Sequence, residues 1–258
     1  MMLKNKVTMK RYAIILILFL GLQLPGTVWA QQIGDRTSSF TIVYGEWKQY
    51  LQKSIPPEVI VRSSISSNVF YDNDPFRKIV ALGVPSLPEV MDRVSEDKLL
   101  IEALSQITKW KYHVVRIGKS PESYTWKVED FPQMCKQGEP LDRLEIWKYW
   151  WREGRFKTNE RFAELHNRWK SLKSEQEDKK ALEVYQEIAD LGILALPYLI
   201  EQVEQEPEFI LVISKLSDGS LPPTATAKEC VQWWEKNRPK FELPSQSISQ
   251  PKTLESGD

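Results

Sequence analysis

The chain has few of the residues that carry most enzyme and metal chemistry. Its 258 residues include two cysteines and two histidines, and no CxxC, HExxH or GxSxG pattern occurs. Without clustered histidine and cysteine ligands, we expect no transition-metal site. Gly118-Lys119-Ser120 resembles the end of a phosphate-binding loop, but His113 stands where that loop requires glycine, so no nucleotide site is expected either.

The chain also carries no net charge. Its 35 lysines and arginines equal its 35 aspartates and glutamates. Residues 1–30 contain four of the basic residues and no acid, so the remaining residues have 31 basic against 35 acidic side chains, a net charge of −4. This balance gives no general attraction to nucleic acid or to an anionic membrane surface, and we expect neither as a partner.

No apolar run is long enough to span a bilayer, which takes roughly 20 residues. The most apolar run, residues 12–22, follows four basic residues and precedes Val-Trp-Ala at 28–30, and this is the order of a secretory signal peptide with its cleavage site. We therefore expect residues 1–30 to be removed and the protein to be exported, as a periplasmic or secreted protein with no membrane span. Both Met1 and Met9 fit as the natural start.

The two cysteines allow two interpretations. An exported protein matures in an oxidising compartment, where Cys135 and Cys230 can form a disulfide. The alternative is two separate thiols, each buried as a small apolar side chain.

An internal repeat is the strongest pattern that the chain does contain. Residues 76–94 (FRKIVALGVPSLPEVMDRV) align with residues 185–203 (YQEIADLGILALPYLIEQV) at an offset of 109 positions. Both copies contain Leu-Gly-x-x-x-Leu-Pro in the same hydrophobic phase. The tryptophan pairs at 150–151 and 233–234 extend the match after a gap, and we expect them to fill the core of the helix that closes each unit.

Each copy predicts a helix that ends at a glycine and is followed by two more helices. Gly192 supplies the left-handed residue that ends a helix, and Pro197 suits the first turn of the next one. We expect positive φ at Gly192 and Gly83, and we expect Gly192→Val to destabilise the fold. Because each helix is apolar on one side only, the helices must stack antiparallel on their neighbours.

The segment LGILALPYLI at residues 191–200 resembles the motif of HEAT-like repeats, of the kind also called PBS-lyase HEAT-like, in an exported bacterial protein. The first copy departs from it at Ser86, where the second has Ala195. The resemblance implies an all-α fold, a short right-handed α-solenoid of helical hairpins in two similar units. Members of this family mostly hold other proteins and share no universal catalytic residues, so the resemblance implies no catalytic residue and no cofactor.

The repeat divides the chain into segments with different expected roles. Unit one contains an insertion, at 109–140, that unit two lacks. Beyond the signal peptide, the expected segments are HEAT-like unit one at 40–157, HEAT-like unit two at 158–241, and a disordered tail rich in serine, proline and glutamine at 242–258.

The insertion predicts a small β-hairpin. Residues 112–117 and 123–128 have strand-like composition, and a turn-rich segment lies between them. Insertions in repeat proteins collect on one face, which is often the binding face. Alternation along the hairpin places several aromatic side chains on one exposed face, and packing down onto the helices is the alternative. The predicted partner-binding residues are Trp110, Tyr112, Tyr124 and Trp126.

We therefore expect a non-catalytic exported protein that acts as a protein–protein interaction scaffold in the periplasm or cell envelope. Its expected partner is an envelope or secreted protein, bound by a helix face and the hairpin. A carbohydrate or cell-wall binding module, in which the same four aromatic residues stack on sugar rings, is the alternative. An enzyme with an acid pair that no motif reveals is a third possibility. No cofactor and no metal is expected.

Overall fold

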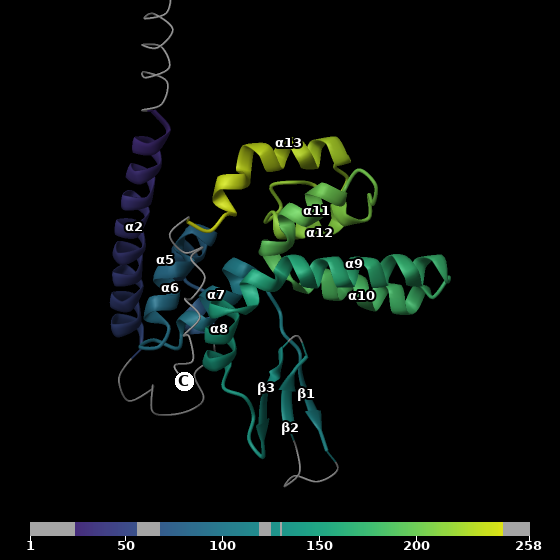
Figure 1. Cartoon of the computed structure of the whole chain (residues 1–258). Helices are drawn as coiled ribbons and strands as arrows, with labels where there is room; N and C mark the ends of the chain where they lie inside the picture. Colours follow the sequence, from purple (N-terminus) through teal and green to yellow (C-terminus); the bar gives the residue numbers. More distant parts are fainter. Residues whose placement is uncertain (1–23, 56–67, 119–124, 130, 245–258) are drawn as a thin grey trace, which may run out of the picture.

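The computed structural model describes residues 24–55, 68–118, 125–129 and 131–244. Helices dominate it, and a small antiparallel sheet of three strands projects from them (Figure 1). No described helix is both long enough and apolar enough to cross a membrane. The expected signal peptide and the expected tail lie largely outside the described residues.

The sheet separates two groups of helices along the chain. The first group is α2 (Leu24–Ser54), α4 (Asn68–Tyr71), α5 (Asp74–Ala81), α6 (Leu87–Arg93) and α7 (Leu100–Thr108). The strands are β1 (Val114–Ile117), β2 (Thr125–Val128) and β3 (Phe131–Gln137). The second group is α8 (Arg143–Arg152), α9 (Thr158–Ser174), α10 (Asp178–Asp190), α11 (Leu196–Gln202), α12 (Phe209–Leu216) and α13 (Ala227–Asn237). Short 3-10 turns are η1 (Val84–Ser86), η3 (Gly154–Lys157), η4 (Gly192–Ala195) and η5 (Arg238–Lys240).

The helices form two matching units. The helices α5, α6 and α7 correspond to α10, α11 and α12 at the offset of 109 positions, and α6 and α11 match residue for residue. Pro88 and Pro197 lie in the first turn of these two helices, where the missing N–H leaves no helical bond unmade. The buried side chains are also equivalent, Leu87, Val90 and Met91 in α6 and Leu196, Leu199 and Ile200 in α11.

The repeat extends to a further helix at a different offset. The helix α2 packs along α5 as α9 packs along α10 (Figure 1). The Trp47 ring of α2 lies 5.4 Å from that of Phe76 in α5, and the Trp169 ring of α9 lies 6.1 Å from that of Tyr185 in α10. Phe76 and Tyr185 are repeat-equivalent, but Trp47 and Trp169 are 122 positions apart. The connection from α2 to α5 is longer than the connection from α9 to α10. The match between α2 and α9 is therefore not visible at the offset of 109 positions.

The last helix of each unit begins with a side-chain cap. The Asp142 carboxylate accepts a hydrogen bond from the first turn of α8, and Thr226 forms a capping box with Glu229 at the start of α13. With the two caps aligned, the buried Trp150 corresponds to the buried Trp234. The expected register matched Trp150 with Trp233, and the aligned caps shift this match by one residue. Each helix buries one indole of its pair and leaves the other half-buried.

Gly192 joins the two units by a close backbone contact. Its φ is +72° and that of Gly83 is +68°, which confirms the expected positive φ at both positions. A Cβ atom on Gly192 would lie 2.3 Å from the Thr108 carbonyl oxygen and 2.6 Å from the Trp110 nitrogen. The chain that leaves α7 therefore passes directly over the glycine turn of unit two, and only glycine leaves room for it.

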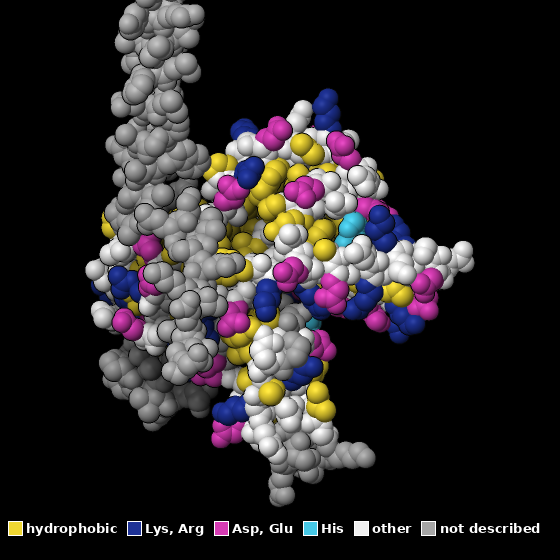
Figure 2. Space-filling model, in the orientation of Figure 1, with side chains coloured by type: hydrophobic (Ala, Val, Ile, Leu, Met, Phe, Trp, Pro, Cys, Tyr) yellow, Lys and Arg dark blue, Asp and Glu magenta, His cyan; other side chains and the backbone are white. Residues whose placement is uncertain are grey.

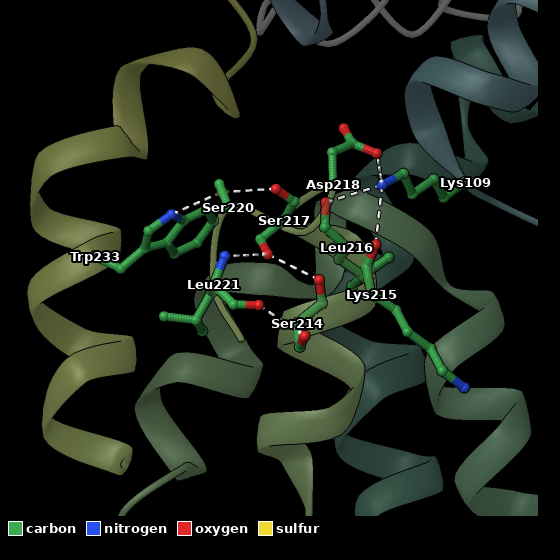
Figure 3. A network of polar contacts seen from close by, with 9 residues as sticks. All are labelled: Lys109, Ser214, Lys215, Leu216, Ser217, Asp218, Ser220, Leu221 and Trp233. Carbon is green, nitrogen blue, oxygen red and sulfur yellow. Dashed lines mark hydrogen bonds and ion pairs between the residues drawn. The ribbon is translucent and has the colours of Figure 1, made fainter. Parts of the chain in front are cut away.

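A lysine from unit one caps the last turn of α12 in unit two (Figure 3). The Lys109 ammonium donates hydrogen bonds to the carbonyl oxygens of Lys215 (3.0 Å) and Leu216 (3.2 Å), and it also pairs with the Asp218 carboxylate. Carbonyls in the last turn have no partner within their own helix, and Lys109 supplies a donor to two of them. Lys109 and Asp218 are repeat-equivalent, and both adopt positive φ, +52° and +55°.

The same network continues from α12 to α13 (Figure 3). The Ser217 hydroxyl donates to the Ser214 carbonyl oxygen at 2.8 Å and accepts from the Leu221 N–H at 3.2 Å. The Ser220 hydroxyl donates to the Ser217 carbonyl oxygen at 2.7 Å and accepts from the Trp233 indole N–H at 2.9 Å. The end of α12 is thus bonded to unit one on one side and to α13 on the other.

The insertion forms a sheet with one more strand than expected. The strands β1 and β2 confirm the expected hairpin, with Val114 opposite Val128 and Arg116 opposite Trp126. The third strand, β3, corrects the expected all-α fold to a mostly helical fold with a three-stranded antiparallel sheet. Its sequence, FPQMCKQ, has no β-branched residue and contains proline, so the pattern does not predict a strand. The buried Val128 and Phe131 anchor the sheet to the helices.

The two cysteines are free thiols in separate elements. Cys135 is exposed on β3, and Cys230 is buried on α13. Burial raises the pKa of the Cys230 thiol, which keeps this side chain protonated and unreactive.

Candidate functional site

The structure separates the four aromatic residues of the predicted site. Trp110 is 4% exposed, whereas Tyr112 and Trp126 are half-buried. Tyr124 lies outside the described residues. Tyr112 and Trp126 are therefore the two members of the predicted set whose rings the structure leaves partly accessible.

Trp110 belongs to the core rather than to an exposed face of the hairpin. Its ring stacks on Trp150 at 5.2 Å, meets the edge of Trp147 at 5.0 Å and lies 6.0 Å from Phe131. Trp110 precedes β1, and its backbone lies against Gly192, so strand alternation does not decide where its side chain points. The packing alternative stated above applies to this residue.

Trp110 also lines two cavities. The first has a volume of about 400 Å³ and lies where the chain leaving α7 meets α10 and α12. Its apolar lining consists of Trp110, Ala189, Val212 and Leu216, and its basic lining consists of Lys109, Lys111 and Lys215. The Asp190 carboxylate lines the same cavity and pairs with Lys111, and Lys109 pairs with Asp218, so two of the three lysine charges are already balanced by carboxylates.

The buried Asp190 carboxylate of α10 contacts the residues that lead into β1. The Asp190 side chain is 9% exposed and accepts a hydrogen bond from the Gln186 amide at 2.9 Å, with the Lys111 ammonium and the His113 Nε2 each at 3.2 Å. The Lys111 N–H also donates to the Asp190 carbonyl oxygen at 2.9 Å. A carboxylate that orients an imidazole can make a general base. Among the described residues, no nucleophile contacts His113. The contact between His113 and Asp190 therefore fixes the start of β1.

The second cavity has a volume of about 380 Å³ and lies between the sheet, α8 and α9. Its aromatic lining consists of Trp110, Phe131 and Trp150. At its polar side Arg161 pairs with Glu164 at 3.0 Å. A Cβ atom on Gly154 would lie 2.5 Å from the Phe131 ring, so this glycine is what allows the ring to sit there. Aromatic faces beside charged groups suit a ligand with both apolar and hydrogen-bonding faces, such as a sugar ring.

A buried polar cluster joins the first helix of unit one to the chain before α7. The Asp97 carboxylate, 8% exposed, accepts hydrogen bonds from the Tyr44 hydroxyl (3.0 Å), the Lys48 ammonium (2.9 Å) and the Leu99 N–H (3.2 Å). Burial, with the hydrogen bond to Asp97, raises the pKa of Tyr44 to about 12. The tyrosine therefore remains a proton donor to the carboxylate at physiological pH.

Unit two brings the equivalent residues together with histidine in place of tyrosine, at ion-pair rather than hydrogen-bond distances. His166 and Lys170 of α9 stand at the equivalent positions, and Glu206 is the repeat equivalent of the buried aspartate. The Glu206 carboxylate lies 3.9 Å from the His166 Nε2 and 3.6 Å from the Lys170 ammonium. The His166 ring is packed 5.5 Å from Phe162 and from Phe209. Burial, with the charge of Lys170, lowers the pKa of His166 against the opposing effect of Glu206.

The stability of the protein is expected to fall as the pH is lowered from about 7.5 to about 5.5, in part through His166. The unfolded chain binds a proton at this histidine near pH 6.5, whereas the folded state binds it at a lower pH, so acid favours the unfolded state in this window. Urea unfolding at both pH values, in a His113→Gln background where His166 is the one remaining histidine, measures the effect. Adding His166→Phe should flatten the dependence, and an unchanged slope would show that His166 is not its source.

The comparisons with known proteins add no relative to these observations. No protein-family model, no curated protein and no solved structure matches the chain. Within the described part of the chain, no group of three or more histidine, cysteine or acidic side chains is placed to hold a metal ion. What the protein does must therefore be inferred from its own residues.

Proposed function

We propose that this protein is an exported, non-catalytic scaffold of the HEAT-like type, a short right-handed α-solenoid that binds another envelope or secreted protein. The observation that supports the proposal is the seam at which the end of α7 passes over Gly192, because close packing between two similar helical units is what a repeat array would require. Arrays of this kind offer extended surfaces to partners, and insertions into them collect on the binding side. No cofactor is needed for such a function.

The surface of the molecule supports binding near the seam. Apolar side chains gather in the space that α13 overhangs, beside α11 and α12, while charged side chains cover α9 and α10 (Figure 2). In Figure 1 the sheet projects below α9 and α10, whereas α13 lies above them. Tyr112 and Trp126 leave part of their rings accessible on the insertion, and half-buried aromatic residues are frequent anchors of protein interfaces.

A carbohydrate or cell-wall binding module is the second candidate. The cavity of about 380 Å³ supports it, because aromatic faces and charged groups line the same space. In this alternative Trp126 and Tyr112 would extend the stacking surface outside the cavity.

The two candidates are separated by capture from envelope extract with the full chain as bait, followed by analysis of both proteins and glycans. A bait with Tyr112→Ala and Trp126→Ala should lose one dominant protein that the unchanged bait recovers. Leu182→Ala is the matched control, because Leu182 is an apolar side chain that is 68% exposed on α10.

Recovery of wall glycan without a protein, together with quenching of tryptophan fluorescence by that glycan, would replace the scaffold by the carbohydrate module. Equal recovery with all baits would contradict a binding role for Tyr112 and Trp126. Export is tested on the same material, since the mature chain should begin at Gln31.

A further inference from the structure

The strand β1 lies at an open edge of the sheet. The strand order is β1-β2-β3, so β2 is the one described strand beside β1. The His113 carbonyl oxygen accepts a hydrogen bond from the Glu129 N–H of the β2 side at 3.0 Å, and by alternation the N–H and C=O of Val114 point away from β2. No described residue bonds to these Val114 groups.

This edge also exposes apolar side chains. Five large hydrophobic residues are exposed in the described part of the chain, and two of them, Val114 (36%) and Ile117 (54%), belong to this strand of four residues. The other three lie on helices. Apolar side chains concentrated at a sheet edge favour the addition of another strand.

The opposite edge carries two features that normally prevent strand addition, a proline and a register break, and β1 has neither; its own protection is limited to its short length and one charged side chain. In β3, Pro132 has no N–H to donate, and the pairing with β2 shifts register between Lys127 and Val128. Prolines and register breaks are the usual protection of an edge strand. The sequence of β1, Val-Val-Arg-Ile, contains neither proline nor glycine, and its pairing with β2 is regular.

The charge of the sheet indicates which kind of strand would pair with β1. The strands β1 and β2 contain the bases Arg116 and Lys127 and no acidic residue, whereas Lys136 of β3 is paired with Glu139. Arg116 lies opposite Trp126, with the guanidinium 6.0 Å from the indole ring, while Lys127 lies opposite Val115, so each face of the β1–β2 pair carries one base. A second copy of β1 would add further positive charge to this edge, whereas a strand with acidic side chains would neutralise it.

We infer that β1 binds an extended, acidic segment of a partner protein, which adds to the sheet as a fourth strand. The inference rests on the proposed scaffold function and names the chemistry of the partner segment. Main-chain hydrogen bonds would supply affinity, and the side chains beside Val114, Arg116 and Ile117 would supply the preference for alternating apolar and acidic residues.

The test is selection of a displayed library of random peptides, about ten residues long, against the full chain. Enriched peptides should alternate β-branched and acidic residues and lack proline. A synthetic copy of the best peptide should slow hydrogen exchange at the Val114 amide, and a copy methylated on alternate backbone nitrogens should not bind, because it cannot pair with an edge.

Two variants locate the binding. Val114→Pro removes the outward N–H and leaves the bonds to β2, and we expect binding at least tenfold weaker. Arg116→Glu should weaken binding of the acidic peptide at least fivefold and improve binding of its lysine-substituted copy. The controls are Leu211→Ala, at another exposed apolar residue, and Lys228→Glu, at an exposed lysine on α13. Unchanged helical circular dichroism, together with unchanged hydrogen exchange at the amides that join β1 to β2, would show that each variant is folded.

Several results would overturn the inference. They are failure to enrich any peptide, enrichment of basic peptides, equal binding by the methylated copy, and unchanged affinity in Val114→Pro. A dimer in sedimentation that Val114→Pro dissociates would assign the edge to a second copy instead. If envelope capture recovers a protein partner that Val114→Pro still binds, this inference fails and the scaffold function stands. If no protein partner is recovered, the scaffold function itself fails.

Discussion

Gly192→Ala is expected to lower the free energy of unfolding by about 3 kcal/mol or more. A left-handed conformation costs a residue with a Cβ atom about 1–2 kcal/mol, and overpacking a closed contact costs about 1–3 kcal/mol more. Both penalties apply here, because φ is +72° and the new Cβ would overlap the Thr108 carbonyl oxygen, the Lys109 carbon and the Trp110 nitrogen. All three are backbone atoms, which cannot rotate away as the end of a side chain can. Urea unfolding followed by circular dichroism measures the loss.

Gly83→Ala is the matched control, since the two glycines are repeat-equivalent. Its φ is +68°, but the nearest atom to a new Cβ, the Lys240 carbonyl oxygen, is 3.7 Å away. The substitution therefore has the conformational cost alone, about 1–3 kcal/mol, because φ +68° with ψ −162° is a backbone region that residues with a Cβ atom rarely adopt. Equal losses at the two positions would mean that the chain over Gly192 can move aside, and would contradict a tight seam.

Trp110→Ala is expected to lower the free energy of unfolding by about 3–5 kcal/mol, the usual cost of emptying the space of a buried tryptophan. The ring is 4% exposed and lies among Trp147, Trp150 and Phe131, which cannot close such a cavity without leaving their own contacts. Thermal and urea unfolding both measure the effect.

Trp126→Ala is the control for this prediction, because Trp126 is a half-buried tryptophan on the same insertion. We expect it to cost less than about 1.5 kcal/mol. A loss of binding in Trp110→Ala would report unfolding, whereas a loss of binding in Trp126→Ala would report the surface itself. Similar costs for the two variants would contradict the placement of Trp110 in the core.

The repeated helices were predictable because their signals are local. A glycine that ends one helix and a proline that starts the next recur at Gly83 and Pro88 and again at Gly192 and Pro197, and the structure places all four as expected. The matching first helices, α2 and α9, were not predictable in this way. Their tryptophans are buried in equivalent places, but the connections that follow differ in length and shift the alignment.

The candidate site was less predictable, because distant parts of the chain decide it. Local alternation around Trp110 favours an exposed hairpin face, yet residues about 40 positions later, on α8, enclose the ring. The contact between His113 and Asp190 spans 77 positions and has no motif. Asp190 reads in the sequence as an ordinary polar residue at a helix end. Hydrophobic periodicity reports which side of an element is apolar, but it does not report which element covers that side.

The Lys109 network makes the two units thermodynamically dependent on one another. Repeat arrays with independent units melt in stages, from whichever unit is weaker. Here the opening of unit one would withdraw the Lys109 ammonium from two carbonyl oxygens of α12, and the opening of unit two would remove the acceptors that hold Lys109 in its left-handed conformation. Each unit thus supplies groups that the other needs, so heating should melt both in one cooperative transition rather than two.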